Sequence, residues 1–371
     1  MIDGKPVAID IYCGAGGLTE GLEIAGFRVL LGIDAKPAPY LVYSRNHRQT
    51  LAFWTDIKQV KNFQNFLRYT GTDYKKIDVV VGGPPCQGFS VANTKTRGSH
   101  NGRTELFEFV RVVKEISPAA FVMENVVGIR SIKDGDLLDT LVSKFEDLGY
   151  DVRTEILNAM SFGVPQSRRR IFIIGNIDGT YRTPLATHGI DKRPPVTVED
   201  AIMGDIAMLD GTMGTRVAEY VAEPKTDYQK VMRRRSPALF DHVVTMNSEV
   251  VKRRMSLIRE GQSLADLLEE GKVPRDLKIA IDHKSVYRRL DRKRPSVTLV
   301  HFRKSMLIHP LENRLLSLRE AARLQSFSDC YRFPGLINYM QQVIGDAVPP
   351  LLAKAVVKPL KRLFKTEMTD E

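Results

Sequence analysis

Three short motifs in this chain present side chains that could carry out covalent chemistry. A thiol, Cys86, follows an apolar run and a Gly-Gly-Pro-Pro turn, and a carboxyl, Glu124, closes a second apolar run. Two guanidinium groups, Arg168 and Arg170, open a third apolar run. A thiolate is a strong nucleophile, a carboxyl can hold or release a proton, and a guanidinium binds carbonyl or carboxylate oxygens. These residues predict nucleophilic catalysis if the fold brings the three runs together.

The elements that would position these residues alternate between strand-like and helical patterns over residues 7–175. Short apolar strands separated by helices are typical of a parallel sheet covered by helices on both faces. Ligands of such sheets bind beyond the carboxyl ends of the strands, where we expect the motifs to lie. We therefore predict an α/β fold with a Rossmann-like sheet. The expected strands are Val7–Ile11, Val29–Ile33, Val79–Val81, Phe121–Met123 and Ile171–Ile174, with a helix from about Glu105 to Lys114.

The pattern changes after about Ile177, where long apolar runs become fewer and basic clusters become more frequent. This change indicates a smaller, irregular domain inserted into the chain. We expect it to span residues 181–311, between the first part of the main domain at 1–180 and a returning segment at 312–371. The returning segment carries a clear helical pattern at Leu318–Phe327.

Most of the formal net charge of +11 lies in one region of the sequence. Residues 231–310 hold 18 Lys and Arg against 9 Asp and Glu, which gives that region a net charge of +9. A solvated basic surface would explain this excess, and so would a lobe that binds a polyanion. Clusters such as Arg233–Arg235 and Arg292–Arg294 could neutralise phosphates, with binding that weakens as salt increases.

Composition argues against several classes of protein. No apolar run approaches the ~18–20 residues needed to span a bilayer, and no signal peptide is evident, so we expect an intracellular protein. Three cysteines, Cys13, Cys86 and Cys330, do not make a disulfide framework in a chain of 371 residues. No clustered Cys/His pattern points to a metal site, so no metal is expected.

A glycine turn near the N-terminus predicts a ligand site. Gly14, Gly16 and Gly17 follow one expected strand, and Asp34 ends the next, 20 residues after Gly14. Such a turn lets the backbone approach a ligand, and the acidic side chain can accept ribose hydroxyls. The pattern fits nicotinamide cofactors, flavins and S-adenosylmethionine (SAM), and a purely structural turn stays open. Thr19 occupies the place of the third glycine, which disfavours a dinucleotide.

The motifs together strongly resemble the cytosine-C5 DNA methyltransferase family. The resemblance rests on Pro-Cys-Gln at Cys86, Glu-Asn-Val at Glu124 and Gln-x-Arg-x-Arg ending at Arg170, in that order. Asp10–Gly17 is similar to the family's first motif, and Gly345–Pro350 to its last. The likeness covers about residues 1–176 and 312–360. It implies a SAM-dependent methyltransferase sheet, with the inserted domain serving target recognition.

The resemblance implies catalytic roles for the thiol, the carboxyl and the two guanidinium groups of these motifs. Cys86 would add to C6 of cytosine, and Glu124 would stabilise the electron density that moves toward N3. Arg170 would contact the base and Arg168 would orient Glu124, with the reverse assignment left open. Asn125 would orient its loop through its amide. The residues expected on the substrate side are Gln87, Ser90, Asn125, Gln166 and Thr298.

The same resemblance assigns residues to the SAM site. Two of them depart from the family's usual sequence, because Tyr12 stands where Phe is common and Asp346 stands where Asn is common. The contact made by Asp346 is therefore open, although its backbone role could survive. The residues expected to bind SAM are Tyr12, Gly14, Gly16, Asp34, Asp56, Ile57, Pro84, Leu106, Asp346, Ala347 and Val348.

Access to C5 of cytosine would require the target base to leave the DNA stack, at a cost of a few kcal/mol. The polar segment Asn93–Arg103 could close over such a base, or could be an ordinary surface loop. Side chains of the inserted domain would read base edges. Arg288, Arg289 and Arg303 are candidates for guanine contacts, with phosphate contacts also open.

We therefore expect a SAM-dependent DNA (cytosine-5)-methyltransferase that acts on a specific double-stranded sequence. We also expect a monomer in the prokaryotic cytoplasm, associated with the nucleoid and paired with a restriction endonuclease, although the resemblance also allows a solitary housekeeping or phage enzyme. An RNA cytosine-5 methyltransferase is a weaker alternative. The tRNA-methylating branch of the family carries a Cys-Phe-Thr signature in its smaller domain, and this chain has no Cys between Cys86 and Cys330. A silent DNA-binding regulator would be expected to lack one of the catalytic side chains. A nicotinamide oxidoreductase would leave the Pro-Cys-Gln and Glu-Asn-Val motifs unexplained.

Overall fold

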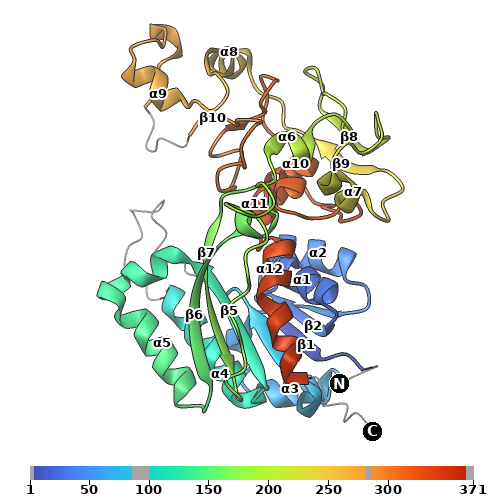
Figure 1. Cartoon of the computed structure of the whole chain (residues 1–371), viewed down its shortest axis with the longest axis vertical. Helices are drawn as coiled ribbons and strands as arrows, with labels where there is room; N and C mark the ends of the chain where they lie inside the picture. The colour runs from blue at the N-terminus through green and yellow to red at the C-terminus, as the bar shows by residue number, and fades with distance from the viewer. Residues whose placement is uncertain (1–3, 86–100, 281–285, 365–371) are drawn as a thin grey trace. The chain divides into compact units, whose positions relative to one another are not determined.

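The computed structural model describes residues 4–85, 101–280 and 286–364 (Figure 1). The expected site residues Cys86, Gln87 and Ser90 lie outside the described residues, as does most of the polar segment that follows them. The chain divides into two compact units. The first consists of residues 1–158, 169–186 and 350–371, and the second of residues 159–168 and 187–349.

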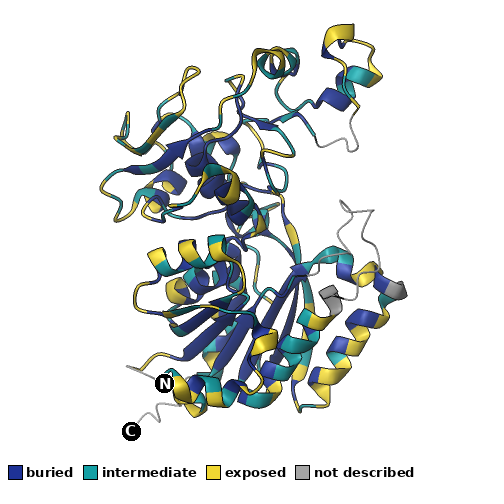
Figure 2. Cartoon of the chain, turned by 180° about the vertical axis from the view of Figure 1, so that it is seen from behind, coloured by how far each residue is buried: buried dark blue, intermediate teal, exposed yellow. Residues whose placement is uncertain are grey.

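The first unit is built on a seven-stranded sheet with the order β3-β2-β1-β4-β5-β7-β6. Its central strands are buried along their whole length, as the dark blue strands in Figure 2 show. This burial explains why their sequences are continuous apolar runs and do not alternate. The strands are β1 (Val7–Ile11), β2 (Arg28–Asp34), β3 (Leu51–Trp54), β4 (Val79–Gly82), β5 (Ala120–Val126), β6 (Asp151–Asn158) and β7 (Arg169–Asn176).

The direction of β7 differs from the parallel arrangement expected for it. It pairs antiparallel with both β5 and β6, whereas β3, β2, β1, β4 and β5 run parallel. The reason lies in the connection, because a short 3₁₀ segment (Ala159–Phe162) joins β6 to β7 where a parallel pair would need a longer crossover. This reversal brings the amino end of β7 beside the carboxyl end of β5, with Arg170 paired to Val126.

Helices cover the two faces of the sheet. On one face α1 packs against α12 so closely that a Cβ on Gly21 would lie 2.4 Å from Cβ of Ala353. Side chains of α4 and α5 join the core on the other face, with Phe109 and Phe145 contacting Phe121 of β5. The mostly parallel Rossmann-like α/β sheet is thereby confirmed. The helices of this unit are α1 (Gly17–Ala25), α2 (Pro37–Asn46), α3 (Phe63–Tyr69), α4 (Asn101–Ile116), α5 (Asp136–Glu146) and α12 (Pro350–Val357).

The second unit is irregular, with short helices and two small sheets. Its helices are α6 (Val198–Ile202), α7 (Asp227–Arg233), α8 (Glu249–Leu257), α9 (Leu264–Glu269), α10 (Leu318–Leu324) and α11 (Ile337–Asp346). Its strands form the pairs β8 (Gly214–Ala218) with β9 (Leu239–Val243) and β10 (Arg288–Arg289) with β11 (Leu307–Ile308). This unit takes in residues 312–349, which the sequence had suggested as part of a returning segment. Among the helices that the structure describes, none combines the length and apolar character needed to cross a membrane.

Candidate active site

An ion pair between Glu124 and Arg170 lies near the carboxyl end of β5, beside the amino end of β7. Oε1 of Glu124 is 3.0 Å from Nε of Arg170, and only 11% and 12% of the two side chains is exposed. Both residues belong to the first unit, and the antiparallel pairing of β5 with β7 brings them together. A charge-assisted contact of this kind is stronger than one between neutral groups and fixes the direction of the carboxylate.

The residues that lead into Cys86 are held against this ion pair. Nδ2 of Asn125 donates a hydrogen bond of 3.0 Å to the carbonyl oxygen of Pro84, two residues before Cys86. A Cβ placed on Gly83 would lie 3.1 Å from Oε2 of Glu124, so the backbone passes directly beside the carboxyl. A side chain at Gly83 would press on the Glu124 carboxyl, which would have to shift by a few tenths of an ångström. The Asn125 bond orients the loop through the amide, the role predicted for it.

Arg168 has a different environment from Arg170. Its side chain is fully buried in the second unit, where Nη1 donates to the carbonyl oxygen of Leu299 at 2.7 Å. Nη2 lies 3.4 Å from the carbonyl oxygen of Asp346. Within the first unit Glu124 thus pairs with Arg170, the alternative assignment that the sequence had left open. The alternation of the two arginines along an extended segment could not decide which of them reaches the carboxyl.

Gln166 and Thr298 tie the beginning of this arginine segment to the second unit. The Gln166 amide donates to the carbonyl oxygen of Leu324 and to the side chain of Gln325, and accepts from the backbone N–H of Leu299. The Thr298 hydroxyl donates to the carbonyl oxygen of Ser167 at 2.8 Å. Both side chains therefore support the local backbone, and their expected contacts with the substrate stay predictions.

The turn after β1 has the shape expected of a ligand-binding turn. Gly14 and Gly16 have φ values of 57° and 84°, a conformation that favours glycine. Oδ2 of Asp34 accepts a hydrogen bond of 3.0 Å from the Gly14 N–H, and Oδ1 accepts one of 2.8 Å from the Lys36 N–H. A Cβ placed on Gly14 would meet no atom within 4 Å, so open space borders the turn on that side. The turn and the carboxylate together fit a nucleoside ligand.

The other residues expected at the SAM site are distributed over both units. In the first unit Leu106 and Ile57 are buried, Pro84 is buried, and the Asp56 carboxylate accepts a hydrogen bond from the Lys58 N–H as a helix cap. In the second unit Ala347 and Val348 are buried and the Asp346 side chain is exposed. The Asp346 carboxylate accepts a hydrogen bond of 2.6 Å from the Gln342 amide, a contact that Asn could also make through its oxygen.

Two side chains beside the expected SAM residues were not found from the sequence. Glu105 accepts a hydrogen bond from the Tyr12 hydroxyl, and its second oxygen lies 2.7 Å from Nζ of Lys58. These three residues come from segments far apart in the chain, so no local spacing could link them. The one available signal was the hydroxyl that Tyr12 adds where the family usually has Phe.

The arginines proposed to read bases differ in exposure. Arg289 is 6% exposed, and its guanidinium donates to the carbonyl oxygens of Ile258, Met255 and His309, so it cannot contact DNA. Its prediction as a guanine reader is wrong because its partners come from α8 and from separate segments that the sequence gave no means to pair. Arg303 is exposed and donates to the side chain of Asn338.

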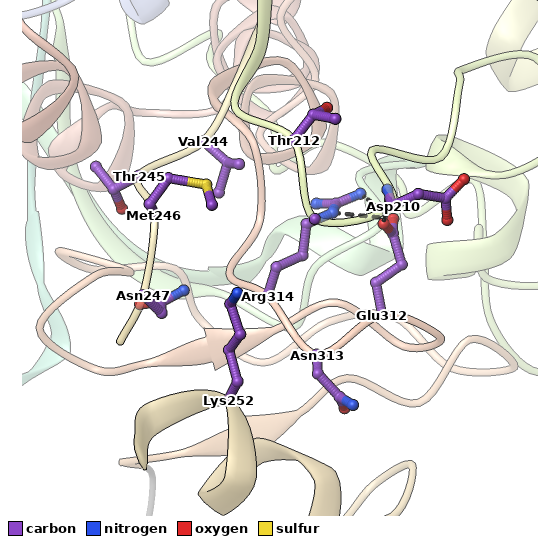
Figure 3. Close-up of a pocket in the computed structure, with 11 residues that line it drawn as sticks. Asp210, Thr212, Val244, Thr245, Met246, Asn247, Lys252, Glu312, Asn313 and Arg314 are labelled. Carbon is purple, nitrogen blue, oxygen red and sulfur yellow. Dashed lines mark hydrogen bonds and ion pairs between the residues drawn. The ribbon is translucent and has the colours of Figure 1, made fainter. Parts of the chain in front are cut away.

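A cavity of about 270 Å³ lies within the second unit (Figure 3). Glu312 and Arg314 form one part of its wall and pair with each other, while Thr245, Met246 and Lys252 form another part. None of Glu124, Arg168 and Arg170 lines this cavity. This cavity and the predicted chemistry therefore occupy different places, and the geometry at the carboxyl end of β5 identifies the candidate active site.

Comparison with known proteins identifies the family. Residues 7–362 match the family of C-5 cytosine-specific DNA methylases. The chain belongs to this family. The Type II methyltransferase M.DdeI of Desulfomicrobium norvegicum is 34% identical over 96% of this chain and 89% of its own length. The Type II methyltransferase M.AgeI of Thalassovita gelatinovora is 33% identical, over 95% and 98% respectively.

The fold of this methylase also has a solved counterpart. A candidate DNA modification methyltransferase encoded within an E. coli prophage superposes with a TM-score of 0.78 at 25% identity, covering 97% of this chain and 99% of the other. The resemblance drawn from the motifs is confirmed, and the methylase is a DNA (cytosine-5-)-methyltransferase. Membership of the family implies SAM as methyl donor and DNA as substrate.

Proposed function

We propose that this methylase transfers a methyl group to C5 of a cytosine flipped out of a specific double-stranded DNA sequence, through covalent addition of Cys86 to C6. The observation that carries the proposal is the geometry around Glu124. Its carboxyl pairs with Arg170 and lies beside the Gly83 backbone, and Asn125 holds Pro84 just before Cys86. In the sequence Cys86 follows directly after Pro85, and the acid beside this turn has a fixed direction.

The chemistry assigns a distinct task to each group. Carbon 5 of cytosine is a weak nucleophile until the Cys86 thiolate adds to C6 and makes C5 enamine-like. A proton held by the Glu124 carboxyl near N3 stabilises the electron density that the addition displaces, and Arg170 keeps that carboxyl in place. SAM would supply the methyl group for the new bond at C5, and its sulfonium S–CH3 bond would break to leave S-adenosylhomocysteine. A base then removes the C5 proton, and the C6–S bond breaks to restore the ring and release Cys86.

The residues that would hold SAM are those of the glycine turn and its neighbours. The Gly14 and Gly16 backbone leaves open space beside the Asp34 carboxylate, which can accept ribose hydroxyls. Buried Ile57 and Leu106 offer apolar surface for the adenine ring. The contacts of Asp346, Ala347 and Val348 with SAM, and those of Gln87, Ser90, Gln166 and Thr298 with the substrate, belong to the same proposal.

The decisive experiment compares the protein with a Cys86→Ala variant on duplex DNA and methyl-labelled SAM. Digestion to nucleosides should place the label on 5-methyl-deoxycytidine, and the variant should place none. A second arm uses DNA containing 5-fluorocytosine, in which fluorine replaces the hydrogen on C5. A base then has no proton to remove from C5, so the Cys86 adduct should persist and be visible as a denaturation-resistant complex. Label on RNA but not on DNA would overturn the choice of substrate, and methylation by the Ala variant would overturn the covalent mechanism.

We also infer that the methylase is a monomer of the prokaryotic cytoplasm that acts on nucleoid DNA and is paired with a restriction endonuclease. Its relatives M.DdeI and M.AgeI are named as Type II methyltransferases, which supports the pairing. DNA recovered from cells that express it should resist an endonuclease of the same target sequence. Light scattering on the purified protein should give the mass of one chain, 41.8 kDa. Unprotected DNA or a dimer mass would contradict these points separately.

A further inference from the structure

The residue that begins the glycine turn has an unusual backbone conformation. Tyr12 follows directly after β1 and has a φ of 61°, in the left-handed region that bulky residues rarely adopt. Such a conformation persists only where the surrounding structure imposes it, and it is concentrated at functional sites. Contacts of the Tyr12 side chain with the rest of the fold must therefore hold this conformation.

The hydroxyl of Tyr12 is bound at a single residue of α4. It lies 2.8 Å from Oε2 of Glu105 and 3.2 Å from the carbonyl oxygen of the same residue. The other carboxylate oxygen of Glu105 is 2.7 Å from Nζ of Lys58, with 13% of the Glu105 side chain and 39% of the Lys58 side chain exposed. Burial and the neighbouring Glu105 carboxylate both raise the pKa of Tyr12, so the hydroxyl remains a hydrogen-bond donor at neutral pH.

These three residues join the separate segments that surround the expected SAM site. Tyr12 lies two residues before Gly14, Glu105 directly precedes Leu106, and Lys58 directly follows Ile57. The glycine turn and the two apolar residues expected at the adenine are thus connected by one chain of polar contacts. A phenylalanine in place of Tyr12 would make neither of the two hydroxyl contacts with Glu105.

We infer that the Tyr12 hydroxyl is a positioning group for SAM, which acts through Glu105 and Lys58 to hold the three segments of the site at a fixed separation. The inference rests on the proposed SAM site and adds residues to it. Preorganisation of this kind lowers the cost of binding, because the segments do not have to be ordered by the ligand. None of Tyr12, Glu105 and Lys58 has a proposed part in the chemical step, so the tie should affect SAM affinity more than turnover.

The test is Tyr12→Phe in the full chain, which removes one oxygen atom. We expect the dissociation constant of SAM, measured by calorimetry, and KM for SAM to rise about tenfold, a usual size for the loss of one charge-assisted hydrogen bond. The value of kcat at saturating SAM should stay within about twofold. Glu105→Gln should weaken SAM binding by a similar factor, and the double variant should lose less than the product of the two, because both changes break the same contact.

The matched control is Tyr150→Phe. The Tyr150 hydroxyl donates a buried hydrogen bond of 2.7 Å to the carbonyl oxygen of Pro118, in the same unit but on the core side of the sheet. This variant should lose stability without a change in SAM affinity. Equal SAM affinity of Tyr12→Phe and the unaltered protein, or equal loss in both Tyr→Phe variants, would overturn the inference. Failure of the unaltered protein to bind SAM would instead contradict the proposed function.

Discussion

The two units use the same pair of chemical groups in different surroundings. In the first unit, Glu124 and Arg170 form one ion pair at 3.0 Å, and about a tenth of each side chain is exposed. In the second, Arg323 is fully buried and binds Asp205 and Asp329 through both of its terminal nitrogens, at 2.7 to 2.9 Å. One guanidinium there binds two carboxylates that have no exposed surface, and Arg233 and Arg319 each lie 3.8 Å from one of them.

This contrast distinguishes an ion pair that stabilises the fold from an ion pair at the candidate active site. A buried charge must have its hydrogen-bonding capacity satisfied by the protein, and a network that does so holds elements together. The Arg323 network connects α10 to residues near α6 and to the loop at Asp329. The Glu124 pair lies at a strand end and retains access to solvent, which a group that meets a substrate requires. Residue type alone would not have distinguished the two.

The buried carboxylates also differ in the direction of their pKa. Burial alone would raise the pKa of Glu320, but Arg314 and His309 outweigh it and lower that pKa. Asp10 of β1 is equally buried and pairs with the Thr19 hydroxyl in place of a guanidinium, so burial raises its pKa to about 7. The contributions of these two carboxyl groups to stability should therefore change with pH in opposite directions.

The largest effect is expected for Arg323→Met. Removal of the guanidinium leaves Asp205 and Asp329 buried with only more distant counter-charges, Arg233 and Arg319 at 3.8 Å, which should lower the free energy of unfolding by about 3–5 kcal/mol. Urea unfolding followed by circular dichroism measures this loss. A change below about 1 kcal/mol would show that the network is dispensable and would remove the contrast between the two units.

Glu124→Gln should have the opposite profile. Loss of the acid should lower kcat at least about 100-fold, while the unfolding free energy changes by less than about 1 kcal/mol. The matched control is Glu155→Gln on β6, because Glu155 and Glu124 are both paired in register with Phe172 of β7. Single-turnover methyl transfer should be unchanged in the control. Comparable kcat values for the two variants would remove Glu124 from the mechanism.

Asp10→Asn tests the pH dependence. The pKa of Asp10 is raised from 3.8 in the unfolded chain to about 7 in the fold, so its contribution to stability is present at low pH and is lost as pH rises through that range. In the unaltered protein this contribution should fall by roughly 2 kcal/mol or more between pH 4 and pH 7. The variant should have a flatter profile of unfolding free energy over the same interval. An unchanged slope would mean that Asp10 titrates normally.

The smallest effect is expected for Arg303→Ala. This exposed residue should contribute to DNA binding through long-range charge, so its loss should weaken binding to all sequences by a few-fold and reduce the salt dependence by about one phosphate contact. Fluorescence anisotropy at several salt concentrations measures both quantities. Arg289→Met is the comparison, because it should act through stability. A sequence-dependent loss for Arg303→Ala would instead indicate a base contact.

The sequence predicted the scaffold of the first unit with little loss. Continuous apolar runs such as Val79–Val81 can be satisfied only by a strand buried on both faces, so the pattern and the structure agree. The direction of β7 was not predictable from its apolar run, because a strand has the same pattern in either orientation. That direction decides which arginine meets Glu124.

The site shows the same division. The family follows from motifs in order along the chain, because Pro-Cys-Gln, Glu-Asn-Val and Gln-x-Arg-x-Arg together resemble the cytosine-C5 DNA methyltransferases. Which side chains touch depends on contacts between distant segments, such as Tyr12 with Glu105 and Arg289 with the loops at Met255 and His309. Such contacts leave no periodic signal in the sequence.

The amino-acid sequence by itself thus determined the family, the Rossmann-like sheet and the set of candidate groups, since these depend on local pattern and on side-chain chemistry. Only the tertiary structure decided that Arg170 pairs with Glu124, that Arg289 is a structural residue, and that Tyr12 is tied to Glu105. The physical reason is that burial and hydrogen-bond partners are properties of the packed chain, which no single segment contains.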